Sequence, residues 1–305
     1  MQAAATTVTV GFGLGCHSAP RRRRAEDVRE ALRVVPAAFT MEGAGVRLRR
    51  ALGSADLRLL DPFLLLDEIH SDREEDWVRG FPTHPHRGFE TVSYLIRGNF
   101  EHRDSVGNHG IIGSGACQWM TAGRGIVHSE MPRQRPGEDL WGLQLWVNLP
   151  AARKMNRPRY QELGAETIPE LDVADARVRL VAGRIGRTRG PIDGIATAPT
   201  MMDVTLPAGA TLRHALPPGD AAFAYLLEGE ARFGARAAPI SEGELAVLGT
   251  GREVVASSET GARFLLLSAR PIGEPVARRG PFVMNTEQEL DQAYADYRSG
   301  RLTDG

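Results

Sequence analysis

Short stretches of alternating apolar and polar residues fill the chain from about Val34 onward. They include residues 46–50, 91–96, 143–149, 202–206, 224–227 and 263–267. A period of two places the apolar side chains on one face of a strand. Gly, Pro, Asn and Asp separate the stretches, as tight turns between strands require. The pattern predicts an all-β chain built from antiparallel β-barrels.

One segment near the C-terminus has helical spacing instead. Leu290, Ala293, Tyr294 and Tyr297 share one face at a period of 3.6 residues, and Thr286 precedes them as a candidate N-cap. The sequence predicts a short helix here.

An internal repeat divides the chain. Residues 94–98 match residues 225–229 at an offset of 131, and residues 123–127 match residues 251–255 at an offset of 128. Two matches in the same order indicate a duplicated domain. The sequence therefore predicts two stacked barrels of the same kind, joined by a connector near residues 150–169.

The predicted division of the chain has four parts. They are a flexible tail over residues 1–31, an N-terminal metal-binding barrel over 32–165, a C-terminal barrel without metal ligands over 166–275, and a final segment with the helix over 276–305.

Composition and charge exclude several classes of protein. The 305 residues carry 37 Lys plus Arg against 38 Asp plus Glu, and 42% are hydrophobic. This near-neutral balance provides no field that would draw the chain onto nucleic acid or an anionic membrane. No apolar stretch approaches the length of a membrane span. Cys16 lies in the predicted tail and Cys117 in a predicted strand, so we expect no native disulfide and a reducing compartment, the cytoplasm.

Two short pairs carry the candidate chemistry. His84 and His86 flank one residue, as do His128 and Glu130. Side chains two apart on a strand share a face, with Cα atoms about 6.5–7 Å apart, so each pair can turn toward one ion. Three imidazole nitrogens and one carboxylate oxygen suit iron and, less selectively, Mn, Co, Ni, Cu or Zn.

The alternative is that these residues are ordinary surface or core side chains satisfied by hydrogen bonds. The repeat provides an internal control. Its offsets place Ala215, Pro217, Ala256 and Ser258 at the four corresponding positions, with His214 one residue out of register. If the four residues were needed to build a barrel, both halves should keep them. This difference favours the metal-ligand interpretation.

Other polar residues near the two pairs receive different expectations. An even spacing from His86 puts Glu90 on the same strand face, either as a fifth ligand or as an ordinary barrel residue, and we favour the second. His102 and Asp104 follow a predicted turn and are expected to be solvated. No role is assigned to the histidines in loop-like stretches, which are His17, His70 and His109.

Several large side chains lie near the two pairs in the sequence: Phe81, Phe89, Trp119, Met120 and Trp146. Most are expected to belong to the core. A pocket walled by some of them would be apolar and would suit a flat organic ligand better than a phosphate.

The chain resembles the pirin family of the cupin superfamily. The similarity extends from about residue 32 to the C-terminus and is carried by residues 61–68, 81–92, 118–132, 142–150 and 280–286. It implies a bicupin whose N-terminal barrel binds iron through His84, His86, His128 and Glu130. Ordinary cupins use a Glu soon after the first His pair, whereas in pirins the second pair supplies it, which again favours Glu130 over Glu90. The resemblance also implies that the C-terminal segment packs across the N-terminal barrel.

Members of this family are described as quercetin 2,3-dioxygenases and some as transcriptional co-regulators. The resemblance therefore implies an Fe(II)-dependent enzyme that opens the heterocycle of a flavonol such as quercetin with O₂. We assign Glu130 as a ligand first and a catalytic base second. The alternative is a non-enzymatic iron-binding regulator that acts through a protein partner. A third hypothesis, a barrel isomerase or decarboxylase, would require metal but no O₂.

Overall fold

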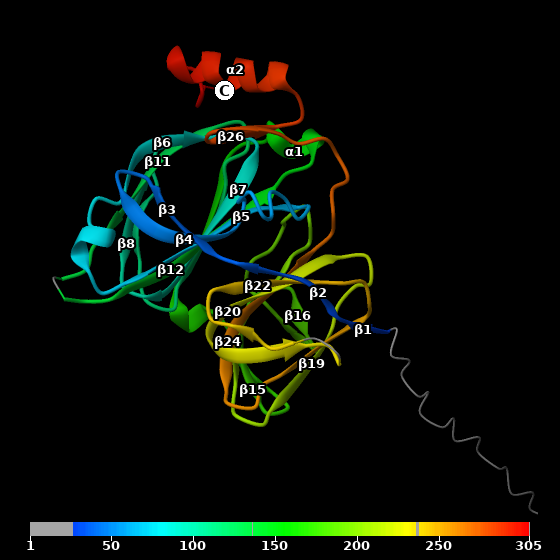
Figure 1. Cartoon of the computed structure of the whole chain (residues 1–305). Coiled ribbons are helices and arrows are strands. Elements are labelled where there is room, and N and C mark those ends of the chain that lie inside the picture. Colours follow the sequence, from blue (N-terminus) through cyan, green and yellow to red (C-terminus); the bar gives the residue numbers. More distant parts are fainter. Residues whose placement is uncertain (1–26, 136, 236–237, 305) are drawn as a thin grey trace, which may run out of the picture.

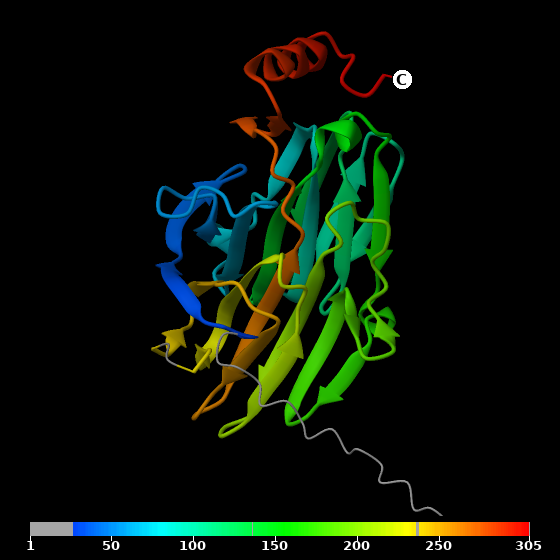
Figure 2. The ribbon, with the colours of Figure 1, turned by 90° about the vertical axis from the view of Figure 1, so that its right-hand side faces the viewer.

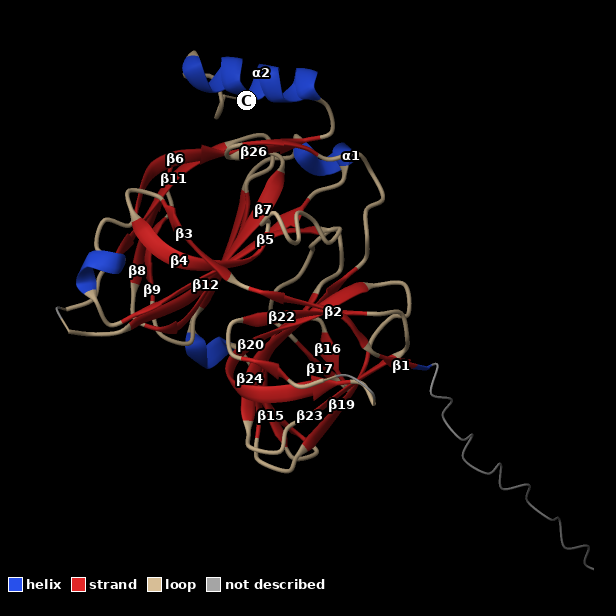
Figure 3. Cartoon of the chain, in the orientation of Figure 1, coloured by secondary structure: helices blue, strands red, loops and turns tan. Residues whose placement is uncertain are grey.

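The structure is a computed structural model that describes residues 27–135, 137–235 and 238–304. Two β-barrels are stacked on each other, and helices are few among the described residues (Figures 1 and 3). This confirms the predicted bicupin architecture. Most of the predicted tail, with Cys16, lies outside the described residues.

The N-terminal barrel consists of two curled sheets. The larger sheet contains, in spatial order, β13 (Arg159–Leu163), β10 (Cys117–Thr121), β7 (Phe89–Arg97), β12 (Leu140–Asn148), β5 (Phe63–Ser71), β4 (Val46–Leu52) and β3 (Ala38–Glu42). The smaller sheet contains β6 (Phe81–His86), β11 (Ile126–Pro132), β8 (Phe100–Asp104) and β9 (His109–Ile112). Both predicted ligand pairs lie in this smaller sheet.

The C-terminal barrel is formed by one 11-stranded sheet. Its main path is β1 (Val28–Arg29), β23 (Glu253–Ser257), β20 (Ala221–Phe233), β24 (Ala262–Ala269), β18 (Thr200–Leu206), β15 (Ala176–Ala182) and β14 (Glu170–Val173). Four further strands pair off this path: β2 (Ala31–Pro36), β19 (Thr211–Ala215), β21 (Ile240–Ser241) and β22 (Glu244–Leu248). A small hairpin of β16 (Arg184–Ile185) and β17 (Thr188–Arg189) forms a separate two-stranded sheet.

The first described strands belong to the second barrel. β1 pairs in parallel with β23, and β2 pairs antiparallel with β22, so residues 28–36 lie among the C-terminal strands (Figure 1). Arg29 is buried, and its guanidinium donates to the carbonyls of Pro217, Asp220, Gly249 and Gly251. The predicted division placed residues 32–36 with the N-terminal barrel, whereas the structure pairs them with the other one. No periodicity within six residues reveals which sheet edge they will join.

A continuous apolar core joins the barrels, and two buried hydrogen bonds cross it. Tyr94 donates to Asp203 over 2.7 Å, and Tyr225 donates to Glu68 over 2.6 Å. The two tyrosines occupy the same position of the predicted repeat, so each barrel contributes one tyrosine and one carboxylate. This reciprocity supports the duplication inferred from sequence.

The C-terminal segment lies at the end of the N-terminal barrel farther from the other barrel (Figures 1 and 2). It contains β25 (Ala277–Arg279), β26 (Phe282–Met284) and α2 (Glu287–Arg298), while the short α1 (Ala151–Lys154) follows β12. Two 3-10 turns, η2 (Glu74–Asp76) and η3 (Ala165–Thr167), complete the described elements.

The predicted C-terminal helix is confirmed. Thr286 caps α2 in a capping box with Glu289, and Leu290 and Ala293 are its buried residues. Among the described residues, no helix is long and apolar enough to cross a membrane. Cys117 is buried in β10.

Candidate metal centre

Strands β6 and β11 bring the two predicted pairs together. They are antiparallel neighbours in which His128 lies opposite His84 and Ile126 opposite His86. The register shifts between His128 and Glu130, so a bulge lies within the second pair. The ligand atoms of His84, His86 and His128 all lie within 4.8 Å of one another. The expected meeting of the three imidazoles is therefore observed.

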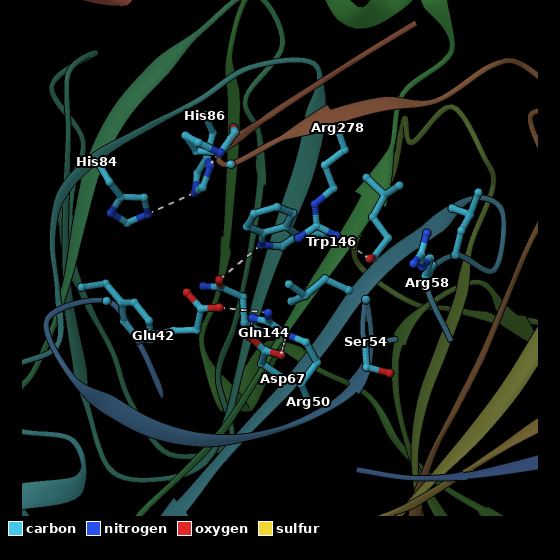
Figure 4. Close-up of a pocket in the computed structure, with 18 of the residues that line it drawn as sticks. Glu42, Arg50, Ser54, Arg58, Asp67, His84, His86, Gln144, Trp146 and Arg278 are labelled. Atoms are coloured by element: carbon cyan, nitrogen blue, oxygen red, sulfur yellow. Dashed lines mark hydrogen bonds and ion pairs between the residues drawn. The ribbon is translucent and has the colours of Figure 1, made fainter. Parts of the chain in front are cut away.

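The two imidazoles of β6 point ring nitrogens at each other. The Nε2 atoms of His84 and His86 are 3.1 Å apart (Figure 4). Each ring has a backbone carbonyl near its other nitrogen: Pro82 at 2.8 Å from His84 Nδ1, and Pro281 at 3.3 Å from His86 Nδ1. A carbonyl only accepts, so these contacts place the protons on Nδ1 and leave both Nε2 atoms with lone pairs.

Two lone pairs facing each other repel unless a metal cation or a proton lies between them. Two nitrogens bound at about 2.1 Å from one ion and at right angles to each other would lie about 3.0 Å apart. The observed 3.1 Å separation matches that arrangement.

His128 strengthens this interpretation. It is buried, and neither of its ring nitrogens has a hydrogen-bond partner among the described residues. Burial, followed by the neighbouring His86, His84 and His102, holds the pKa of His128 well below its usual range. Burial and His84 likewise lower the pKa of His86. Both rings are thus kept neutral, the form in which imidazole binds a metal.

Glu130 lies on the other side of His128. Its carboxylate accepts from the Ser93 hydroxyl at 2.7 Å and from the Gln144 amide at 2.8 Å. Within 4.8 Å its ligand atom groups with His128 and His102, but not with the two imidazoles of β6. Each carboxylate oxygen retains a lone pair beyond the one that accepts these bonds.

His102 and Asp104 correct a sequence expectation. Both were expected to be solvated, yet their side chains are fully buried, with 3.3 Å between His102 Nε2 and Asp104 Oδ2. The register of β8 against β11 explains the error, because His102 lies opposite Glu130. The available signal was the His-x-acid spacing of His102 and Asp104, which is the same as that of His128 and Glu130.

Glu90 does not join the imidazoles. Its carboxylate accepts from Trp119 Nε1 at 3.1 Å and from the Thr121 hydroxyl at 2.7 Å. Burial raises the pKa of this carboxyl to about 7. The even spacing from His86 loses its meaning because β6 ends at His86 and β7 begins at Phe89, with Gly88 at φ +91° between them.

The C-terminal segment packs against Arg87 and Gly88, the two residues that follow His86. A Cβ added to Gly88 would lie 1.9 Å from the carbonyl oxygen of Val283, so only glycine fits where β26 meets this turn. The buried Lys154 ammonium donates to the carbonyls of Gly88 and Val283, at 2.7 and 3.0 Å. The Arg87 guanidinium pairs with Asp296 of α2 at 2.7 Å. Two cations thus hold this segment against the residues that follow His86.

A cavity of about 1120 Å³ opens beside the imidazoles. His84 and His86 line it together with Phe81 and Trp146 (Figure 4). Phe89 lies behind this wall and packs against Trp146, with 4.4 Å between the ring centroids and 38° between the ring planes. Of the other predicted aromatic and apolar neighbours, Trp119 belongs to the core between the barrels and Met120 to a small core cluster.

The remaining histidines lie elsewhere. His70 stacks on Trp141, and His109 contacts Glu101 at 2.8 Å. His17 lies outside the described residues.

The structure also corrects the comparison of the two repeats. In the C-terminal barrel Leu212 faces Ala256 as His84 faces His128, and His214 faces Val254 as His86 faces Ile126. The offset is therefore 128 in both strands. His214, and neither Ala215 nor Pro217, is the counterpart of His86. The second barrel keeps one imidazole and lacks the other three side chains, and within the described residues His214 belongs to no group of three metal-binding side chains.

Comparisons with known proteins agree with this architecture. The family description Pirin matches residues 45–147, and Pirin C-terminal cupin domain matches residues 201–303. A "Pirin-like protein" of Caulobacter vibrioides is 45% identical over 277 residues, which are 90% of this chain and 99% of that protein. A Pseudomonas aeruginosa protein named "Putative quercetin 2,3-dioxygenase" is 43% identical, covering 86% of this chain and 93% of its own length.

The fold is also similar to that of a solved structure. Quercetin 2,3-dioxygenase from Acinetobacter baumannii superposes with a TM-score of 0.81 at 31% identity, covering 90% of this chain and 98% of the other. Together with the two matched domains, these similarities show that the chain belongs to the pirin family.

Proposed function

We propose that His84, His86, His128 and Glu130 hold one divalent metal ion. The observation that carries the proposal is the pair of facing Nε2 lone pairs 3.1 Å apart, beside a buried His128 that has no partner for either nitrogen. Ring-nitrogen lone pairs that converge on one point are unfavourable without a cation and favourable with one. Glu130 would complete the set and balance half of the charge of the ion.

The donor set favours iron as the metal. Neutral imidazoles with a carboxylate and no thiolate suit Fe(II), and Mn, Co, Ni, Cu and Zn remain the alternatives. A divalent ion at this position would act as a Lewis acid that lowers the pKa of a hydroxyl bound to it.

We further propose that the protein is a dioxygenase that opens the heterocycle of a flavonol such as quercetin with O₂. The aromatic wall of Trp146 and Phe81 suits a flat substrate that enters from the cavity toward the imidazoles. Glu130 would accept the substrate proton, while Ser93 and Gln144 hold its carboxylate in place. A small aromatic molecule and O₂ are the proposed partners, and a cytoplasmic location is proposed with them.

The test is aerobic turnover of quercetin by iron-loaded protein, beside metal-free protein and the His128→Ala variant. The proposal predicts quercetin loss and O₂ uptake with the loaded protein only. Stoichiometric iron binding without turnover would contradict the enzyme and favour the iron-binding regulator. Metal-dependent conversion of a substrate without O₂ uptake would favour the isomerase or decarboxylase.

The role of Glu130 is tested separately with Glu130→Gln, which keeps a donor oxygen but no longer accepts a proton. Retained metal with lost turnover supports the base role. Undiminished turnover would refute it, and lost metal would show that the ligand role dominates.

A further inference from the structure

The cavity beside the imidazoles is larger and more charged than a plain flavonol requires. Its volume of about 1120 Å³ exceeds the upper end of the usual range for small-molecule sites, roughly 1,000 Å³. Three arginines and two carboxylates line it, namely Arg50, Arg58, Arg278, Glu42 and Asp67. The lining therefore carries one excess positive charge, apart from any metal.

The two carboxylates of the lining both pair with one of its arginines, Arg50. Arg50 forms two bonds to Asp67, at 2.8 and 2.7 Å, and a third contact to Glu42 at 2.9 Å. The register of the strands shows what the second barrel has instead: Leu180 and Met202 occupy the places of Arg50 and Asp67. Because that barrel folds with two apolar residues there, a polar wall is not required by the fold.

Arg58, which is exposed, and Arg278 are the two cations of the lining that form no ion pair with a carboxylate among the described residues, and Arg278 is the one beside Trp146. Its guanidinium lies over the Trp146 ring at 4.7 Å and donates to the Leu64 carbonyl at 3.0 Å. Among the described residues, no carboxylate lies within ion-pair distance of it. Burial, followed by the nearby Arg50, lowers the pKa of Arg278, and the attraction of Asp67 and Glu42 offsets part of this effect. A guanidinium has five N–H donors, so most remain for a ligand.

Trp146 connects this cation to the candidate metal centre. The Trp146 ring lies 5.3 Å from the His86 ring and 4.7 Å from the Arg278 guanidinium, so His86 and Arg278 are at most about 10 Å apart. In Figure 4 Arg278 descends from the C-terminal segment beside Trp146, on the cavity side of His86. An aromatic molecule of two or three rings spans this separation.

We propose that Arg278 determines substrate specificity by binding an anionic substituent on an aromatic substrate whose metal-binding hydroxyl lies at the imidazoles. The substrate class is a phenolic conjugate bearing a sulfate or carboxylate group remote from that hydroxyl. A planar guanidinium stacked on an aromatic ring is suited to such a group, because it offers paired donors in a fixed orientation. The inference rests on the proposed function and names the substrates of the same site.

The experiment measures binding to iron-loaded protein without O₂, so that no turnover interferes. The probes are quercetin and quercetin 7-sulfate, which share a free 3-hydroxyl, and quenching of tryptophan fluorescence reports their dissociation constants. Unsubstituted protein is expected to bind quercetin 7-sulfate more tightly than quercetin. Arg278→Gln is expected to reduce this preference about tenfold, which corresponds to the loss of one charge-assisted hydrogen bond. Arg278→Lys keeps the charge without the fork and should retain part of it.

Arg279→Gln is the matched control. It removes the same charge from the next residue, which pairs with Glu287 and Asp291 of α2 and does not line the cavity. Its preference should equal that of the unsubstituted protein, and all three variants should keep the same iron content. An unchanged preference in Arg278→Gln, an equal loss for both flavonols, or no binding of the sulfate would overturn the inference.

The two proposals fail in different ways. Turnover of quercetin without an Arg278-dependent preference for the sulfate contradicts the specificity role alone. An Arg278-dependent preference without opening of either flavonol under O₂ contradicts the dioxygenase alone.

Discussion

Corresponding strands around the centre of each barrel pair in the same register, but several corresponding positions differ in polarity. In the N-terminal barrel the inward positions carry His84, His128, Ser93, Gln144 and Asp67. Their counterparts by strand register are all buried and apolar: Leu212, Ala256, Ala224, Leu266 and Met202. One barrel thus has a polar pocket where the other has a filled core.

At the interface between the barrels, in contrast to the pocket, corresponding positions carry the same types of polar residue. Glu68 accepts a hydrogen bond from Tyr225 and pairs with Arg49. Asp203 accepts a hydrogen bond from Tyr94 and pairs with Arg263. The two tyrosines and the two carboxylates lie on strands that correspond between the repeats, and both copies keep a buried carboxylate bound to a tyrosine of the other barrel. These residues were retained in both copies, whereas of the four candidate metal ligands only His86 has a counterpart of its own type, His214.

The difference separates structural from functional polarity. The buried tyrosines and carboxylates present in both copies support the interface between the barrels. A buried polar side chain present in one copy needs another explanation, and ligand binding is the one proposed for the cluster around His128. The predictions below test this distinction, beginning with the largest expected effect.

Removing one imidazole should give the largest difference in iron affinity between a variant of the N-terminal barrel and a variant of the C-terminal barrel. His128→Ala is expected to weaken iron affinity about a thousandfold, since it removes one of the four proposed ligands. His214→Ala, at the counterpart of His86, should leave the affinity unchanged. Competition with a chelator measures both. Equal losses in the two variants would contradict the comparison.

Glu90, whose counterpart is Ala221, should make stability depend on pH. Its pKa is raised to about 7 in the folded protein from an ordinary value of 4.5, so the folded state keeps a proton that the unfolded state loses between these values. The contribution of Glu90 to stability therefore falls by about 3 kcal/mol as pH rises from 4.5 to 7, and it is constant on either side of this range.

Glu90→Gln removes this titration. Urea unfolding of metal-free protein at pH 5 and pH 8 should show a smaller decrease for the variant than for the unsubstituted protein. The same pH dependence in both would show that Glu90 does not retain its proton.

The reciprocal tyrosines should contribute to stability and not to metal binding. Tyr94→Phe and Tyr225→Phe each remove a hydrogen bond to a buried carboxylate, so each should lower the free energy of unfolding by about 2 kcal/mol. Iron affinity should stay the same in both. If one substitution alone weakened iron binding, the interface would not be functionally symmetric.

The smallest effect is expected behind Glu130. Gln144→Leu installs the residue type found at its counterpart, Leu266, and removes one of two hydrogen bonds that orient the carboxylate. Iron affinity should fall about tenfold, as for other residues that orient a ligand. An unchanged affinity would indicate that Ser93 suffices to position Glu130.

The barrels, the helix and the meeting of the three imidazoles could be predicted from the sequence because each depends on a local period or spacing. Leu290 and Ala293 follow a helical period, and the His84–His86 spacing places two rings on one strand face. It failed where strand pairing decides the outcome. Residues 32–36 join the second barrel, His102 is buried opposite Glu130, and the counterpart of His86 is His214. Arg278 was not found from sequence, because its position over Trp146 depends on the path of the C-terminal segment.

The central claim is that one cation binds between the facing imidazoles of β6 and the buried ring of β11. The most direct measurement is an anomalous-difference map from crystals of iron-loaded protein, recorded on both sides of the iron absorption edge. The account predicts one strong peak per chain, in contact with His84 Nε2, His86 Nε2 and His128. A map without that peak, or with its strongest peak away from these imidazoles, would contradict it.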